Sequence, residues 1–177
     1  IKNRIKMSRT IFKEEQKFRQ AWILIVMVLS AIVWLYMIIR YIFIDDLFQK
    51  EPGAAWTTLI AGIIPILVIY LFAKMKLITI VDTDGVKCRF TILQRSFKSF
   101  PKETIQTYEI RQYKPITDYG GWGIRVGRGK RGSAYNVSGN IGLQLYLNDG
   151  KKFLIGTQQP ESLSRSMDKL MGKTMTE

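Results

Sequence analysis

The stretch LITIVDTDGVKCRFTIL, residues 77–93, indicates most clearly how the C-terminal part of the chain folds. Runs rich in β-branched residues lie on both sides of Asp84-Gly85, and an Asp-Gly pair in that position is typical of a β-hairpin turn. Residues 78–83 alternate between two faces, as expected of a strand with one buried face. The sequence therefore predicts two antiparallel strands here.

The β pattern continues toward the C-terminus. After a connection that contains Pro101, residues 104–113 (TIQTYEIRQY) have the composition of a third strand. Residues 142–157 (GLQLYLNDGKKFLIGT) predict a second hairpin, centred on Asp149-Gly150. Strands that follow one another with no long helix between them are typical of an antiparallel sheet.

A helix is predicted near the end of the chain, at about residues 160–171. Pro160 suits a first helical turn, apolar residues follow at helical spacing, and Gly172 is a typical stop. We expect residues 77–172 to form one small antiparallel β domain, a strongly bent sheet or small barrel that this helix closes. Residues 173–177 would be a short tail.

Two long apolar segments precede this domain, at about residues 21–44 and 54–73. The second carries no charge and has Pro65 near its middle. About 20 apolar residues in a helix are needed to cross roughly 30 Å of hydrocarbon. The sequence therefore predicts a transmembrane helical hairpin over residues 21–76, and a cleaved signal peptide is the competing interpretation of the first segment.

Charge predicts an orientation for this hairpin. Residues 1–20 form a basic N-terminal segment, in which Met7 is a plausible initiator, whereas the connection at 41–56 is acidic. The positive-inside rule then places the N- and C-termini in the cytoplasm. Aromatic rings and lysines favour the membrane interface, and the residues expected there are Trp22, Trp56, Tyr70, Lys74 and Lys76.

Composition argues against catalysis. The chain has a formal net charge of +13, no histidine and one cysteine, Cys88. It therefore lacks the commonest general base and any cysteine cluster that could hold a metal. We expect no catalytic residues, no cofactor and no metal. Basic residues outnumber acids twofold from Lys74 onward, but the aromatic residues are not grouped like a base-stacking platform, so we expect no nucleic-acid partner.

The segment YGGWGIRVGRGKRGSAYNVSGN, residues 119–140, is rich in glycine and contains no acid. Backbone amides at glycines can turn toward an anion, and cations between them attract phosphate. Three interpretations remain open: a twisted hairpin with solvated cations, a contact with a protein partner, and a site for an anion such as a lipid headgroup. The cations that would make a contact are Arg125, Arg128, Lys130 and Arg131. The glycines that would shape the loop are Gly120, Gly121, Gly123, Gly127, Gly129 and Gly132.

Two apolar helices, a DG hairpin, the sequence FPKETI before a third strand, and a terminal helix together resemble bacterial pleckstrin-homology-like membrane proteins. The stretches YGGWGIR, AYNVSGN and LIGTQQPESL also resemble a recurrent pattern in uncharacterised members of that group. The resemblance implies an α+β membrane protein of the bacterial inner membrane, multi-pass, with a pleckstrin-homology-like β domain in the cytoplasm. It implies no particular ligand, because many such domains bind proteins or have no known ligand.

Our leading hypothesis is a membrane-anchored, non-catalytic binding module. It would be a scaffold or accessory subunit that docks onto a larger membrane protein complex, or onto further copies of itself, through its β domain and helices. The alternative is a sensor of anionic lipid headgroups in the bilayer, using the glycine-rich basic loop. Binding through exposed cations should weaken steeply with ionic strength, whereas docking through an apolar surface should not.

Overall fold

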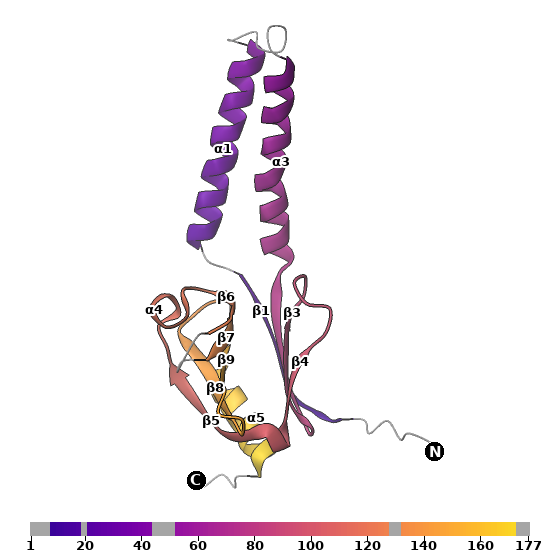
Figure 1. Cartoon of the computed structure of the whole chain (residues 1–177), viewed down its shortest axis with the longest axis vertical. Coiled ribbons are helices and arrows are strands. Elements are labelled where there is room, and N and C mark those ends of the chain that lie inside the picture. Colours follow the sequence, from indigo (N-terminus) through magenta and orange to yellow (C-terminus); the bar gives the residue numbers. More distant parts are fainter. Residues whose placement is uncertain (1–7, 19–20, 44–51, 128–131, 173–177) are drawn as a thin grey trace, which may run out of the picture. The chain divides into compact units, whose positions relative to one another are not determined.

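The computed structural model describes residues 8–18, 21–43, 52–127 and 132–172. The chain divides into two compact units, each of which is described by itself. The β unit comprises Ile1–Phe18 and Met75–Glu177, and the helical unit comprises Arg19–Lys74. The helical unit is therefore an insertion within the sequence of the β unit (Figure 1).

The first sheet of the β unit has the strand order β1-β2-β3-β4, and all neighbouring strands are antiparallel. Its strands are β1 (Thr10–Lys17), β2 (Lys76–Asp82), β3 (Gly85–Phe90) and β4 (Lys98–Pro101). Lys17 pairs with Lys76, so the chain leaves and re-enters this sheet at neighbouring positions. The predicted hairpin at Asp84-Gly85 is present as the turn between β2 and β3.

The second sheet has the order β5-β8-β9-β7-β6. Its strands are β5 (Ile105–Gln112), β6 (Gly123–Arg125), β7 (Ser133–Asn136), β8 (Ile141–Leu147) and β9 (Lys152–Gly156). Strand β8 pairs antiparallel with both β5 and β9, β7 runs parallel to β9, and β6 pairs antiparallel with β7. The helical elements of the β unit are η1 (Lys102–Thr104), α4 (Pro115–Tyr119) and α5 (Pro160–Met171).

One core joins the two sheets. Buried side chains from both sheets, such as Leu77 and Ile155, pack in one cluster with Leu163 and Met167 of α5. Rings also cross between the sheets, with Phe100 of β4 and Phe153 of β9 separated by 4.7 Å between centroids. The predicted helix at 160–171 is thus present as α5, and its apolar face completes the core.

The helical unit contains α1 (Ala21–Phe43) and α3 (Pro52–Lys74). The Trp34 ring of α1 lies against Gly62 of α3, where a Cβ atom would come within 1.6 Å of the ring. Large aliphatic side chains are exposed along both helices, including neighbouring positions such as Ile32 (57%) and Val33 (62%). Exposure at neighbouring positions means that the apolar surface covers more than one face of the helix.

Among the residues that the structure describes, no helix combines the length and apolarity that a membrane crossing requires. This finding corrects the predicted transmembrane hairpin over 21–76. It equally corrects the prediction of a multi-pass inner-membrane protein with cytoplasmic termini.

The predicted fold class is corrected in a second respect. The chain is an α+β protein with two sheets and, in the described ranges, four α-helices, instead of a membrane hairpin joined to one barrel. The first sheet takes its edge strand, β1, from the segment at 1–20, where no strand was predicted. The inward-facing positions of β1 include Glu14 and Gln16, so burial there does not follow the apolar alternation by which strands are recognised.

Candidate functional site

A cleft of about 460 Å³ opens in the β unit. Strand β4 lines one side of it, and the β8–β9 turn with the start of β9 lines the other, beside Ser133 of β7. These segments are far apart in the sequence and meet because β4 is the last strand of its sheet and its Phe100 packs on Phe153. The cleft therefore lies where the two sheets approach each other.

Aromatic rings hold a cation at this cleft. The Nζ of Lys98 lies 4.4 Å from the centroid of the Phe153 ring, 5.7 Å from that of Tyr135 and 5.8 Å from that of Phe100. An ammonium over aromatic faces is attracted by the negative potential of the rings. Lys98 is exposed in spite of these contacts, so its charge remains accessible to a ligand.

The opposite side of the cleft carries two more lysines and one acid. Lys151 Nζ lies 2.7 Å from Asp149 Oδ2, and this contact lowers the pKa of Asp149 and raises the pKa of Lys151. Lys152 Nζ lies 5.3 Å from the centroid of the Tyr146 ring. Because Lys151 already neutralises Asp149, the described lining of the cleft has a surplus of positive charge.

The glycines at 120–123 build turns and leave few amides for a ligand. Gly120 ends α4 in the left-handed region, with φ 72°, and its N–H donates to carbonyls of that helix. Gly121 has φ 115°, and a Cβ there would lie 2.9 Å from the Arg125 guanidinium. The Gly123 N–H donates to Asn136 Oδ1 at 2.9 Å. Strands β6 and β7 pair as a hairpin here, which supports the interpretation of a twisted hairpin with glycines at its turns.

Two further glycines permit close backbone approaches beside the cleft. A Cβ at Gly127 would lie 1.5 Å from the Gly132 carbonyl oxygen, and one at Gly132 would lie 2.1 Å from the Lys152 carbonyl oxygen. No other residue type fits such distances. Gly132 therefore holds the end of the glycine-rich segment against Lys152.

Three of the four predicted contact cations lie outside the part of the chain that the structure describes. Arg128, Gly129, Lys130 and Arg131 lie outside the described residues. Arg125 is half-buried on β6, and its Nε is buried without a hydrogen-bond partner. Arg125 does not line the cleft, so the cleft and this predicted contact residue are separate features.

The residues predicted at a membrane interface are divided between the two units of the chain. Trp56 and Tyr70 are exposed on α3, and Lys74 ends that helix. Lys76 begins β2, and its Nζ lies 3.3 Å from Glu15 Oε2. Trp22 belongs to α1, but its side chain is outside the described set. Their assignment to an interface stays a prediction.

The chemistry available to the described residues is limited. Cys88 is buried, and burial raises the pKa of its thiol to about 12, so it is inert as a nucleophile near neutral pH. No group of three potential metal ligands occurs within the described ranges. The absence of an enzymatic activity and of a cofactor stays a prediction.

The cleft residues were not recognised in the sequence. Lys98 was assigned to a connection, and Lys151 and Lys152 were assigned only to a hairpin. One signal was available, because residues 85–102 contain five cations and no acid. That run includes Lys98 and the whole of β4.

Comparisons of the chain with protein-family models, with curated proteins and with solved structures gave no match. The resemblance to pleckstrin-homology-like proteins therefore stays a prediction.

Proposed function

We propose that this protein is a non-catalytic binding module of a larger protein assembly, and that its cleft holds an acidic segment of a partner protein. The observation that carries the proposal is the lining of the cleft, which contains Lys98, Lys151 and Lys152 and, among its described residues, only one acid, Asp149. Carboxylates of a partner would pair with these lysines, while its apolar side chains pack on the exposed Pro101 and the half-buried Leu147 of the lining.

The size of the cleft favours a peptide segment over a single small anion. A volume of about 460 Å³ falls in the range of sites that hold ligands of several connected groups. Complementary charge at such a site raises the association rate and selects the correct partner. Pro101 and Leu147 in the lining supply the apolar contact that ion pairs in water do not.

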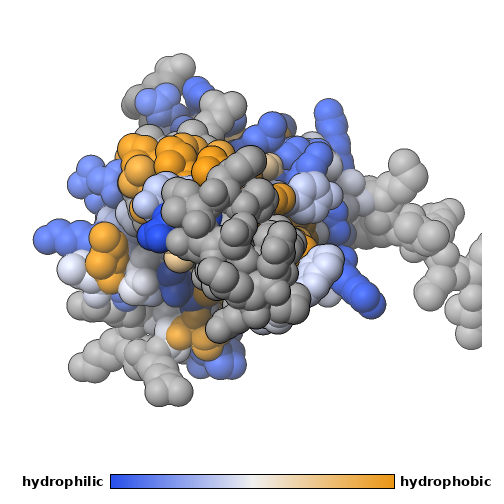
Figure 2. Space-filling model, turned by 90° about the horizontal axis from the view of Figure 1, so that it is seen from above, coloured by the Kyte–Doolittle hydropathy of each residue, from blue (hydrophilic) through white to orange (hydrophobic). Residues whose placement is uncertain are grey.

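The helical unit supports a role within an assembly. Its exposed aliphatic side chains cover more than one face of α1, and helices of this kind are normally covered by other chains or by an apolar phase. We propose that apolar helices of the partner cover them. Figure 2 shows hydrophobic patches between hydrophilic side chains on the face seen from above.

The test uses the full chain and an eight-residue peptide of alternating Glu and Leu that carries a fluorophore. Changing Lys151 and Lys152 together to Gln should weaken binding at least tenfold, as measured by fluorescence anisotropy. The control changes Arg165 and Lys169 of α5 together to Gln, which removes the same two charges from exposed positions that do not line the cleft. Control binding should equal wild-type binding.

Equal losses in the double variant and the control would mean that net charge alone attracts the peptide, and the proposal would fail. The proposal would also fail if the peptide did not bind to the wild-type chain. For the helical unit, native mass spectrometry of complexes from the source membrane or cytosol distinguishes a stoichiometric protein partner from lipid or detergent alone. Finding only lipid or detergent would contradict the proposal that helices of a partner protein cover the helical unit.

The alternative of a lipid headgroup at the glycine-rich loop depends on Arg128, Lys130 and Arg131. These residues lie outside the described ones, so that alternative stays a prediction.

A further inference from the structure

The connection between β3 and β4, residues 91–97, presents two neighbouring aliphatic side chains to solvent. Ile92 is 43% exposed and Leu93 is 61% exposed. Each exposed aliphatic group in water is unfavourable by about 25 cal/mol per Å² of apolar surface. A pair of them at the tip of a polar loop therefore suggests an apolar contact.

Hydrogen bonds hold this loop in one conformation. The Gln94 N–H donates to the Phe90 carbonyl, and the Gln94 side-chain oxygen accepts from the Phe90 N–H, both at 3.0 Å. Gln94 Nε2 also donates to the Tyr135 hydroxyl of β7 at 2.6 Å. At the start of the loop, Thr91 exchanges hydrogen bonds with the backbone of Lys76. The exposed tip is thus supported on both sheets, and its shape is built before any ligand arrives.

Two arginines, Arg89 and Arg95, flank the tip in the sequence. Arg89 lies with its guanidinium 4.6 Å from the centroid of the Phe97 ring, and its Nη1 donates to the Arg95 carbonyl at 3.4 Å. Arg95 itself is exposed. The sequence from Gly85 to Lys102 contains five cations and no acid, and of these five Lys87 is paired with Asp82.

An apolar tip with an arginine on each side in the sequence matches one kind of surface. Anionic lipid presents negative headgroups above an apolar layer, so cations and aliphatic side chains are satisfied at two depths of the same surface. An acidic peptide would satisfy the cations but leaves the two adjacent aliphatic side chains without a deep apolar layer. We propose that the 91–97 loop docks on an anionic lipid surface, with Ile92 and Leu93 entering it and Arg89 and Arg95 at headgroup level. This contact is peripheral and independent of the peptide cleft.

The experiment places a fluorophore sensitive to polarity at the tip. In the full chain, Cys88→Ser leaves Leu93→Cys as the single labelling position, because Cys88 is the chain's one cysteine. Vesicles of 40% phosphatidylglycerol in phosphatidylcholine should shift the emission of this label to the blue. The same label at Gln106→Cys, exposed on β5, should not respond.

Adding Arg95→Gln should weaken the response to the anionic vesicles about fivefold, as expected for one cation near a charged surface. Raising the salt to about 0.5 M should weaken it further. Pure phosphatidylcholine vesicles should give a much smaller response, since they offer the apolar layer without net charge.

A label at position 93 that stays in water while the chain sediments with the anionic vesicles would overturn the proposal. An equal response to both kinds of vesicle, unchanged by Arg95→Gln, would also overturn it, since the contact would then be apolar adsorption only. Lys151→Gln with Lys152→Gln should leave the response unchanged, so failure here is distinct from failure of the peptide cleft.

Discussion

The two Asp-Gly turns of the β unit share a dipeptide but differ in what surrounds it. Gly85, between β2 and β3, is buried with φ 149°, and a Cβ there would lie 2.2 Å from the Phe100 carbonyl oxygen of β4. Gly150, between β8 and β9, has φ 77°, and a Cβ there would meet nothing within 4 Å. The first glycine is needed for packing between strands, and the second only for the turn itself.

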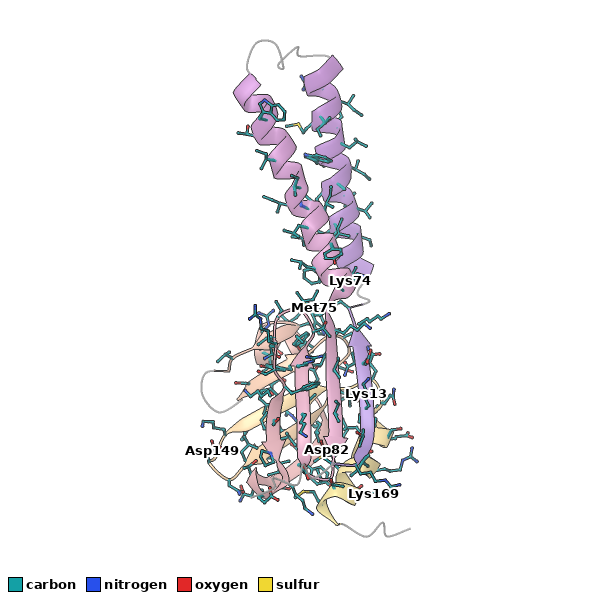
Figure 3. All side chains as sticks on the ribbon, turned by 90° about the vertical axis from the view of Figure 1, so that its right-hand side faces the viewer. Lys13, Lys74, Met75, Asp82, Asp149 and Lys169 are labelled. Carbon is teal, nitrogen blue, oxygen red and sulfur yellow. The ribbon has the colours of Figure 1, made fainter. Side chains whose placement is uncertain are left out.

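The carboxylates near these turns differ in the same way. Asp82 is 3% exposed and accepts hydrogen bonds from Ser8, from the backbone of the turn and from Lys87 Nζ at 2.6 Å. Asp149 is exposed, and the contacts found for it are with Lys151 of its own turn. Figure 3 shows both aspartates toward the end of the β unit away from Met75. One turn therefore stabilises the fold, while the other is free to line a cleft.

The largest expected effect is at Gly85. Gly85→Ala should lower the free energy of unfolding of the β unit by about 2–4 kcal/mol, because the new Cβ meets backbone atoms of β4 and the φ angle is unfavourable for alanine. Urea unfolding followed by amide hydrogen exchange in β2 measures this unit separately from the helices. A loss below about 1 kcal/mol would show that β4 can move away, and the contrast between the two turns would weaken.

Asp82→Asn should cost somewhat less, about 2–3 kcal/mol, because the amide keeps one acceptor but leaves Lys87 without its partner. Burial alone would raise the pKa of Asp82, but the Lys87 ammonium and the Asp84 N–H together lower it. The stabilisation is therefore present above the ordinary pKa of about 3.9 and is lost as pH falls through the lower folded value. Wild type and variant should converge in stability below about pH 4. A constant difference down to pH 2 would contradict this account.

Gly150→Ala should have a smaller effect, about 1 kcal/mol, since space is available and only the left-handed backbone opposes alanine. Gly150→Asn is the matched control, because asparagine tolerates this conformation, and it should recover most of the loss. Thermal unfolding of the three proteins tests this order. Equal losses for Ala and Asn would mean that a contact outside the turn is responsible.

Local chemistry allowed both turns and the final helix to be predicted. Asp-Gly determines where a hairpin reverses, and Pro160 with Gly172, which has φ 72°, bounds α5. Strand β1 could not be predicted in this way, because its buried Glu14 is satisfied by Thr157 Oγ1 and the Gln158 N–H, more than 140 positions away in the chain. Hydrogen-bond partners that lie so far away in the sequence cannot be inferred from the local alternation of apolar and polar residues.

The candidate site was harder to predict than the fold. Phe100 and Phe153 come from different sheets, and nothing in either local segment indicates that their rings meet. In the glycine-rich segment, Gly127 and Gly132 permit close backbone contacts, and a role of the segment toward an anion stays a prediction. In each of these cases, the structural role of a residue depended on a neighbour distant in sequence.

The smallest effect on stability is expected at Asp149. A substitution there should instead change the binding of the peptide. Asp149→Asn should leave the unfolding curve unchanged, because this side chain is exposed and bonded within its own turn. It should strengthen binding of the Glu-Leu peptide about twofold to threefold, since Lys151 is released from its neutralising partner inside the cleft. The comparison is made at neutral pH, because the Glu side chains of the peptide protonate near their ordinary pKa of about 4.3, before Asp149, whose pKa Lys151 lowers. Unchanged peptide affinity at neutral pH would mean that Lys151 does not contact the ligand, and the peptide would then be assigned to Lys98 and Lys152 alone.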